Sequence, residues 1–509
     1  MNVLLQFQIF FSSIASIVTS PEKMVLLFGS TLLGIIFGAL PGLTATLGVA
    51  LLTTLTYSLQ TESAFITLIG IYVGAIYGGS YTSIMINIPG TAASAASTLD
   101  GYPMAQKGLA GKALGLCTTC STLGTIIGMM FLVTLTPIIA VLALQFTSFE
   151  FFLLAFLGIS LSGSISAPDT VQKGWLAGFF GLFLAMVGRD QLQTFPRFTM
   201  GISQLEGGID IIAVLIGAFG IPQIIDVLVD KQSLPKMAQI NKILPSFRDI
   251  GRNFKHIVRS ALVGVGIGVV PGIGEDIAAW VSYGTAKRTS KHPEKFGTGA
   301  EEGLISPEIA NNASIGGAMV PLLTLGIPGS PPGAMLLGAL LLHGVAPGPM
   351  LEIEHPGFTL GISAMLLMAS ITMWILGMLL AKQVIKLLRV PSSLFMPVVG
   401  VLCLIGSYAL GLKVFNLYLM LPMGIIAYLM GRFGYPIPPL VIGVILGSMA
   451  DANLRRGLMV SKGSLMPFLS RPVALILVLV IVIVAVANSD LFKIISARIS
   501  GKKKTNGNS

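Results

Sequence analysis

Gly34-Ile-Ile-Phe-Gly38-Ala-Leu-Pro41-Gly42 recurs with the same spacing as Gly264-Val-Gly-Ile-Gly268-Val-Val-Pro271-Gly272. Proline removes a backbone donor and glycine adds conformational freedom, so each copy predicts a helix that is interrupted at its Pro-Gly pair. A second Pro-Gly motif follows each copy, Asn87-Ile-Pro-Gly-Thr91 after the first and Gly326-Ile-Pro-Gly-Ser330 after the second. Two pairs of motifs in the same order predict an internal duplication.

The composition around these motifs is that of a membrane protein. Of 509 residues, 54% are hydrophobic and 10% are charged, against about 25% charged residues in a typical soluble protein. Long apolar runs predict helical spans rather than a β-barrel. The expected fold is therefore an all-α polytopic membrane protein with about 10–13 transmembrane segments. The net charge of +10 suits cytoplasmic loops, because basic residues orient membrane proteins and are scattered here rather than gathered on one face.

Hydropathy and charge divide the chain into five parts. Residues 1–23 predict an interfacial segment or a weak first span. A first transmembrane half and a second one are joined by a long basic connection, which we expect in the cytoplasm, and a basic tail ends the chain. The boundaries are 24–228 for the first half, 229–259 for the basic loop, 260–488 for the second half and 489–509 for the tail.

Charges near the motifs predict that the two halves have opposite orientations. The two copies of the repeated motif at residues 34–42 and 264–272 are the first and second Gly-Pro-Gly copies. Arg259 precedes the second copy and Lys287 follows it, so both ends of this copy favour the cytoplasm. About 27 residues separate these two cations, too few for two spans, so we expect a re-entrant hairpin. The Ile-Pro-Gly motifs at residues 87–91 and 326–330 are the first and second breaks. After the second break the chain continues into acidic residues, whereas after the first break it continues to Lys107 and Lys112. The sequence therefore predicts two inverted repeats, each with a re-entrant Pro-Gly hairpin and a broken helix.

Interrupted helices at membrane depth indicate transport. Unwound backbone is tolerated there only when it is buried in protein or lines a cavity. The N-termini of half-helices attract anions, and exposed carbonyl groups can bind Na⁺. Four such segments meeting near the midplane are typical of a secondary transporter.

The Pro-Gly pairs at residues 41–42 and 271–272 are the first and second tips of the predicted hairpins. The predicted substrate site consists of glycines, prolines, hydroxyls and amides at the two tips and two breaks, because such groups bind anions without burying a charge. Any single hydroxyl in this set has the alternative of a bond to its own helix. The predicted substrate-binding residues are Pro41, Gly42, Thr44, Thr46, Asn87, Pro89, Gly90, Thr91, Gly272, Gly274, Asn311, Asn312, Pro328, Gly329 and Ser330.

Glu275 and Asp276 are the most unusual polar pair, because carboxylates deep in a membrane are costly and usually functional. We expect these two residues and Thr324 to couple transport to Na⁺ or H⁺. A structural salt bridge, for example to Arg288, and a carboxylate at a helix start are the alternatives for the pair. Beyond a possible Na⁺ at the tips, no metal site or cofactor is expected.

The same stretches resemble the large membrane subunit of the tripartite tricarboxylate transporters. Gly38–Thr46, Tyr77–Gly90 and Asp100–Ala105 carry the resemblance in the first half, and Pro307–Ala313, Pro321–Ser330 and His343–Pro349 carry it in the second. The resemblance implies ion-driven uptake of citrate-like carboxylates without ATP, across the bacterial inner membrane. It also implies two partners, a small membrane subunit and an extracytoplasmic solute-binding protein.

Other functions fit the sequence less well. Cys117 and Cys120 form a C-x-x-C without a second pair, which favours helix packing over a metal site. Gly272-Ile-Gly-Glu-Asp276 resembles an intramembrane protease motif loosely but lacks a partner aspartate, and no P-loop occurs. We therefore expect no enzyme. An anion channel, or an exporter of small organic acids without a binding protein, is the alternative to an importer of elevator or rocking type.

Overall fold

Helices dominate the computed structural model, which describes residues 3–40, 42–167, 170–190, 192–229, 243, 247–387, 392–409 and 412–487. Within these residues, eight helices are long and apolar enough to cross a membrane, and six shorter apolar helices accompany them. The predicted all-α polytopic membrane fold is confirmed. The predicted total of about 10–13 segments exceeds the eight long helices for two reasons. Some apolar helices, such as Val171–Ala185 and Pro472–Val486, are shorter than 18 residues, and other predicted spans are divided at Pro-Gly pairs.

Both Gly-Pro-Gly copies interrupt a helix. Gly42 and Gly272 have φ values of +89° and +78° at these interruptions, a conformation that residues with a Cβ rarely adopt. Pro41 lies outside the described residues. The interrupted helices are α2 (Pro21–Ala39) and α3 (Ala45–Leu55) in the first copy, and α11 (Phe254–Gly268) and α12 (Gly274–Thr289) in the second.

The glycines of both copies bring two helix backbones into contact. α2 packs along α4 (Thr61–Ile86), and α11 packs along α13 (Glu301–Leu325). A Cβ added to Gly38 would lie 2.1 Å from a carbonyl oxygen of α4, and one added to Gly268 would lie 2.4 Å from a carbonyl oxygen of α13. Any larger side chain would force these helices apart.

The second helix of each pair ends at a matching break. Asn87 ends α4 and Gly326 ends α13, both in the left-handed conformation, with φ values of 59° and 69°. A Cβ on Gly90 would lie 2.1 Å from a carbonyl oxygen of α2, and one on Gly329 would lie 2.5 Å from a carbonyl oxygen of α11. The structure thus contains the same arrangement twice. The opposite orientation of the two copies in the membrane stays a prediction.

The two copies also contact each other reciprocally. α3, after the first Gly-Pro-Gly copy, packs on α14 (Pro331–Leu342), which follows the second break. α12, after the second copy, packs on the short η1 (Ala92–Ser94), which follows the first break. Each copy therefore packs on the break of the other, as a two-fold relation between them would produce.

Substituting Gly268 with alanine is expected to lower the free energy of unfolding by about 1–3 kcal/mol, since overpacking in a tight contact costs that much. Gly266 on the same helix has no atom within 4 Å of an added Cβ, and alanine there is expected to be neutral or stabilising. Thermal unfolding of the two detergent-solubilised variants measures the difference. Equal melting temperatures would contradict the assigned backbone contact.

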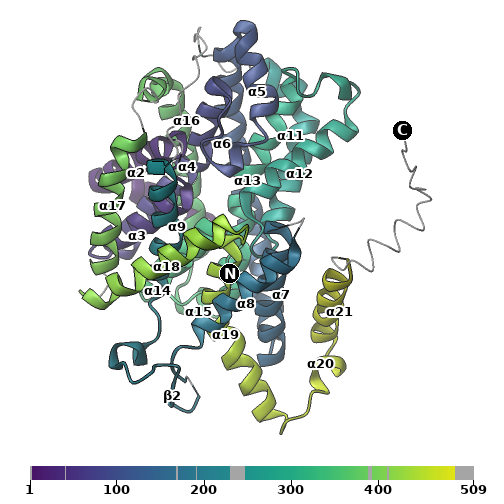
Figure 1. Ribbon diagram of the computed structural model, residues 1–509. Helices are drawn as coiled ribbons and strands as arrows, with labels where there is room; N and C mark the ends of the chain where they lie inside the picture. The colour runs from purple at the N-terminus through teal and green to yellow at the C-terminus, as the bar shows by residue number, and fades with distance from the viewer. Residues whose placement is uncertain are drawn as a thin grey trace, which may run out of the picture. The chain divides into compact units, whose positions relative to one another are not determined.

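Two compact units make up the described chain, and each is described by itself. The first contains residues 1–145 and 209–433. In it α6 lies beside α13, and α11 and α12 pack on α13 as well (Figure 1). Its remaining elements are α1 (Val3–Thr19), α5 (Thr98–Met104), η2 (Ala105–Leu109), α6 (Ala110–Ala143), α9 (Ile211–Val229), α10 (Phe247–Arg252), η4 (Pro293–Lys295), α15 (Leu351–Glu354), α16 (Phe358–Leu387), α17 (Ser392–Ala409) and α18 (Val414–Arg432).

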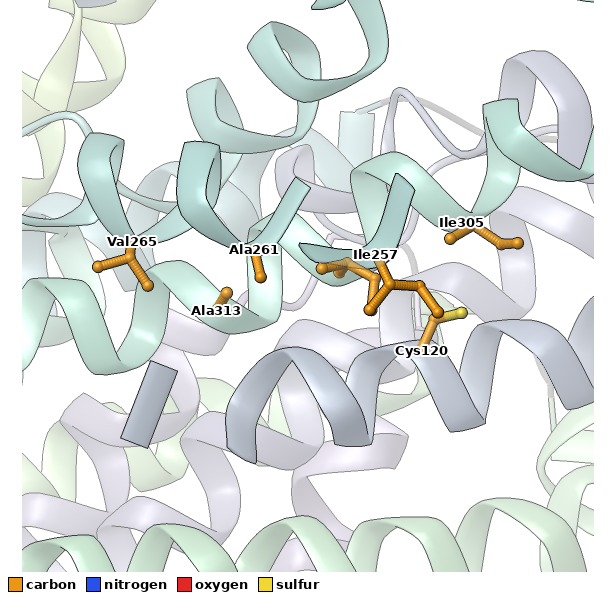
Figure 2. Close-up of a cluster of buried hydrophobic side chains, with 7 residues drawn as sticks. Cys120, Ile257, Ala261, Val265, Ile305 and Ala313 are labelled. Carbon is orange, nitrogen blue, oxygen red and sulfur yellow. The ribbon is translucent and has the colours of Figure 1, made fainter. Parts of the chain in front are cut away.

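Buried apolar side chains, both small and branched, fill the contact between α6, α11 and α13. Figure 2 shows Cys120 of α6 beside Ile257 of α11, at one end of a cluster that also contains Ala261 of α11 and Ala313 of α13. Cys120 is fully buried in this cluster. It acts there as a packing residue, which agrees with the interpretation of the C-x-x-C pair as helix packing.

The second unit contains residues 146–208 and 434–509 and so draws one segment from each predicted half. Asp190, beside its β-hairpin, accepts a hydrogen bond from Arg455 and is 4% exposed. This guanidinium, with backbone donors, lowers the Asp190 pKa to about 2. The elements of this unit are α7 (Ser148–Ser166), α8 (Val171–Ala185), the antiparallel strands β1 (Gly188–Arg189) and β2 (Pro196–Arg197), η3 (Ser203–Gly207), α19 (Ile437–Val460), α20 (Pro467–Ser470) and α21 (Pro472–Ala487).

The predicted five-part division of the chain stays a prediction. Much of the basic loop 229–259 and all of the tail 489–509 lie outside the described residues.

Candidate functional site

The second tip and the second break lie against each other. The backbone N–H of Gly272 at the tip donates to the carbonyl oxygen of Pro328 at the break, at 3.2 Å. Gly274 has a φ of +70°, and a Cβ there would lie 2.9 Å from the Cβ of Ser330. Glycine at these positions is what allows two unwound segments to approach this closely. The structure therefore brings together Gly272, Gly274, Pro328 and Ser330, as the sequence predicted.

A tyrosine from the first repeat joins this meeting point. The hydroxyl of Tyr72 on α4 donates to the carboxylate of Glu275 and lies 2.9 Å from the hydroxyl of Ser330. Ser330 also caps α14 by accepting from the N–H of Gly333, at 3.1 Å. Tyr72 and Ser330 are fully buried, and Glu275 is 2% exposed. One hydrogen-bonded chain thus links the first repeat, the second tip and the second break.

Glu275 and Asp276 differ in their surroundings although they are neighbours. Both lie in the first turn of α12, where a carboxylate is favoured by the helix dipole. Glu275 is buried and bonded to Tyr72, whereas Asp276 is half-buried. Arg288 donates to the carbonyl oxygen of Gly284. The described contacts therefore connect Glu275, rather than Asp276, to the place where the second tip, the second break and Tyr72 meet.

The first tip has different partners. Thr44 caps α3 by accepting from the N–H of Leu47 at 3.2 Å, and it also accepts from the side chain of Gln223 at 3.1 Å. A Cβ on Gly42 would lie 2.4 Å from a methyl group of Val227. Thr46 is 7% exposed. Among the hydrogen bonds of the described residues, none links this tip to the second tip.

The first break mixes buried and exposed residues. Gly90 is buried and its N–H donates to the carbonyl oxygen of Gly79 at 3.3 Å, while Asn87 and Pro89 are exposed. Thr91 forms a capping box with Ser94 at the start of η1. The polar groups in the buried part of this break therefore cap the short helix η1 that follows.

Predicted residues on α13 face the first break and α6. The amide of Asn311 donates to the carbonyl oxygen of Ala93 in η1, at 3.2 Å. Asn312 accepts from the hydroxyl of Thr125 on α6, at 3.3 Å. Thr324 donates to the carbonyl oxygen of Val320 in its own helix, at 2.7 Å, which is the alternative that the sequence left open for single hydroxyls.

Tyr72 and Asn311 occupy equivalent places in the two copies. The sites on α4 and α13 that receive the packing glycines, Ile71 and Ala310, each immediately precede one of these residues. Tyr72 bonds to Ser330 after the second break, and Asn311 bonds to Ala93 after the first. Each helix therefore reaches across to the break of the other repeat.

Two buried carboxylates were not assigned a role from the sequence. Asp100 is fully buried and accepts from the N–H groups of Gly297, Gly299 and Ala300 at 2.7–3.1 Å, and from the hydroxyl of Tyr283 at 2.9 Å. It ties α5 to the N-terminus of α13. Glu308, also fully buried, accepts from three serine hydroxyls. Their acidic side chains in apolar surroundings were the available signal, but their partners are about 200 residues away.

A cavity of about 350 Å³ lies elsewhere in the same unit, near the start of α4 and α16. Phe65, His343 and His355 line it, and burial lowers the pKa of His343. None of the predicted site residues lines this cavity.

Comparison with known proteins follows the same motifs. The model of the tripartite tricarboxylate transporter TctA family matches residues 24–442. An "Uncharacterized 52.8 kDa protein in TAR-I ttuC' 3'region" of Agrobacterium vitis is 36% identical over 456 residues, which cover 89% of this chain and 91% of that protein. An "Uncharacterized protein in TAR-II ttuC' 3'region" of the same organism is 36% identical over 208 residues, 41% of this chain and 86% of that protein. No solved structure matches the chain.

Proposed function

Because the chain belongs to the tripartite tricarboxylate transporter TctA family, we propose that it is the large permease subunit of a secondary transporter that imports organic carboxylates. Membership points to a transporter rather than an enzyme. The proposed substrates are tricarboxylates or related carboxylate anions. The proposed driving force is a Na⁺ or H⁺ gradient, with alternating access around one site near the membrane midplane.

The observation that carries this proposal is the meeting of the second tip, the second break and α4 at Tyr72, Glu275 and Ser330. Three helices start at the interruptions, α3, α12 and α14, and helix N-termini attract anions. Unwound backbone at membrane depth supports a binding site, because it is tolerated only where protein or a cavity surrounds it. The predicted substrate-binding residues thus supply dipoles, amides and hydroxyls rather than a basic side chain.

Glu275 supports the coupling part of the proposal. A carboxylate beside a site for a carboxylate substrate repels that substrate unless a cation neutralises one of them. Bound Na⁺, or a proton on the carboxyl group, therefore favours substrate binding, and by reciprocity the substrate favours cation binding. This mutual preference is what a symporter requires. Asp276 and Thr324 remain proposed members of the coupling site.

The proposed partners are a small integral-membrane subunit and an extracytoplasmic solute-binding protein, and the proposed location is the bacterial inner membrane. The family description, which names a tripartite system, supports these partners.

The proposal is tested by citrate uptake into proteoliposomes that contain the full-length chain with its partner subunits. Wild type is expected to accumulate citrate against its gradient, and an ionophore that collapses the ion gradient is expected to stop accumulation. Continued, unsaturable flux after the ionophore is added would support a channel and overturn the proposal.

Alanine substitution of site residues tests the assignment. Replacing Ser330 or Asn312 is expected to lower uptake about tenfold, because each loses a hydrogen bond of about 1–1.5 kcal/mol in a buried position. Replacing Asn87 or Thr91 is also expected to lower uptake. Ser363, which is fully buried and donates to a carbonyl oxygen of its own helix, is a matched residue outside the proposed site, and its alanine variant is expected to show a smaller loss. Normal uptake in all four site variants, with normal membrane insertion, would remove the site from the tips and breaks.

A further inference from the structure

Import of a polyanion needs more than one compensating cation. The inside-negative membrane potential opposes entry of each uncompensated negative charge, and a citrate-like substrate carries up to three. If the proposed import function is correct, a cation at Glu275 alone leaves most of the substrate charge uncompensated. A second binding place for a cation is therefore expected inside the same unit.

Glu308 lies in the middle of α13 and is fully buried. Its carboxylate accepts from Ser80 of α4 at 2.6 Å, from Ser97 at 2.5 Å and from Ser121 of α6 at 2.9 Å. The first two hydroxyls share one carboxylate oxygen, Oε1, whereas Ser121 is the hydroxyl that bonds to Oε2. The thiol of Cys117 on α6 is a further, weaker donor to this carboxyl group. Since a carboxylate oxygen has two acceptor positions and a thiol is only a weak donor, Oε2 has room to bind a proton beside Ser121.

In the part of the chain that the structure describes, no basic residue pairs with this carboxyl group. Among the ion pairs of the described residues, none includes Glu308. The thiols of Cys117 and Cys120 on α6 interact electrostatically with Glu308, and neither carries a positive charge. A buried ionised carboxylate without a cation is costly, so protonation of this group is favoured whenever protons have access.

Many titratable groups on the other elements around α13 have partners other than Glu308. On α11, His256 lies 3.5 Å from Glu302, which is six residues, or about 9 Å along the helix axis, from Glu308. The remaining pairs are Tyr77 of α4 with Thr118, Asp100 of α5 with Tyr283 of α12, Lys112 of α6 with Glu301, Arg259 of α11 with Thr289, and Glu275 of α12 with Tyr72.

Ser121 can exchange partners without leaving a polar group unpaired. Thr118, Thr119, Thr122 and Thr125 on the same helix all donate to the carbonyl oxygen four residues before them. Ser121 instead donates to Glu308, although the carbonyl oxygen of residue 117 stands at the equivalent place on the helix. A rotation of the Ser121 hydroxyl is therefore enough to redirect its donor.

We propose that Glu308 carries a second coupling cation, a proton, during transport. A proton binds to Oε2, the Ser121 hydroxyl turns to the carbonyl oxygen of Cys117, and the new O–H of Glu308 donates to the Ser121 oxygen. Release reverses these changes and returns the proton to water on the other side. Na⁺ fits less well, because all three serine hydroxyls would have to turn their donors away from the carboxylate and present lone pairs.

The same helix connects Glu308 to the first break. Ser97 follows η1 by three residues, and Asn311, one turn further along α13, bonds to Ala93 within η1. A movement of the first break thus displaces one donor of Glu308 directly. This contact gives alternating access a way to open the carboxyl group to one side at a time.

Glu308→Gln is the principal test, measured in two ways. In the purified full-length chain, a carboxylic acid C=O stretching band is expected to titrate in infrared difference spectra of wild type and to be absent from the variant. A variant spectrum that keeps this band would overturn the assignment, and this readout does not depend on transport.

In proteoliposomes with the partner subunits, one coupled proton raises the equilibrium accumulation of citrate about tenfold per unit of pH gradient. Glu308→Gln is expected to lose this factor while citrate counterflow without a gradient stays within about twofold of wild type. Unchanged dependence on the pH gradient would overturn the inference, and loss of Na⁺ dependence instead would identify a Na⁺ site. Absence of any citrate flux in wild type would overturn the proposed function rather than this step.

Ser121→Ala serves as a second variant that keeps the carboxyl group. It is expected to bind the proton but at a shifted pH, since one of the three hydroxyl donors to the carboxylate is lost. Glu62→Gln is the matched control for Glu308→Gln, because Glu62 is a partly exposed glutamate that pairs with Lys23 at 2.5 Å. A pH profile that is unchanged in Ser121→Ala would contradict the proposed exchange of hydroxyl partners.

Discussion

Replacing Glu275 with glutamine is expected to remove the dependence of citrate binding on the cation held at Glu275 and to lower accumulation against a gradient. Two unit charges about 6 Å apart repel by about 3 kcal/mol at an effective dielectric constant of about 20. This corresponds to an affinity change of about 100-fold. Wild type should therefore bind citrate about 100-fold more weakly when the coupling cation is removed.

Glutamine keeps the shape of Glu275 and its place beside Tyr72 but carries no charge. Removal of the cation should therefore lower the citrate affinity of the variant by less than about threefold. Isothermal titration of the purified chain with citrate, with and without Na⁺ and at two pH values, measures both changes. Asp276→Asn is the neighbouring control. Because Asp276 is half-buried, its variant should keep most of the cation dependence. The reverse result, with dependence lost only in Asp276→Asn, would transfer the coupling role to Asp276.

Replacing Asp100 with alanine is expected to destabilise the folded chain by about 4 kcal/mol or more. The substitution leaves three backbone N–H groups and the Tyr283 hydroxyl without their acceptor, at about 1–3 kcal/mol for each buried unpaired group. Since the free energy of unfolding of a soluble domain is only about 5–15 kcal/mol in total, we expect little folded protein to remain. The yield and melting temperature of the detergent-solubilised chain, measured by size-exclusion chromatography, report the loss.

Two further variants separate the carboxylate from its surroundings. Tyr283→Phe removes one donor of Asp100 but leaves three N–H groups bound, so we expect a loss of only about 1–2 kcal/mol. Gly303→Ala places a Cβ 2.0 Å from a carboxylate oxygen of Asp100 and should resemble Asp100→Ala. A normal melting temperature in Asp100→Ala would mean that α5 and α13 do not depend on this contact.

The interruptions of the helices were predictable because proline and glycine act on their own backbone. The Gly-Pro-Gly copies and the breaks at Asn87 and Gly326 lie where the sequence places them. The close approach of Gly38 and Gly268 to neighbouring helices follows from the same residues, since only glycine allows such contacts. Spacing along the chain was enough to recognise that the arrangement occurs twice.

The partners within the site were not predictable in the same way. Tyr72 stands in an apolar run that is typical of a core helix, and its partner Glu275 is 203 residues away. The sequence treated Glu275 and Asp276 as one pair, but their unequal burial follows from how α12 packs. Glu308 and Asp100 were visible as acids, yet nothing near them in the chain indicated serines or backbone amides as their donors.

The amino-acid sequence by itself determined that this chain is a membrane protein, where its helices break and that one arrangement of broken helices occurs twice. Those properties depend on hydropathy and on the local preferences of proline and glycine. The tertiary structure alone decided which carboxylates meet which hydroxyls, because hydrogen bonds between residues about 200 positions apart depend on how distant helices pack and not on local sequence.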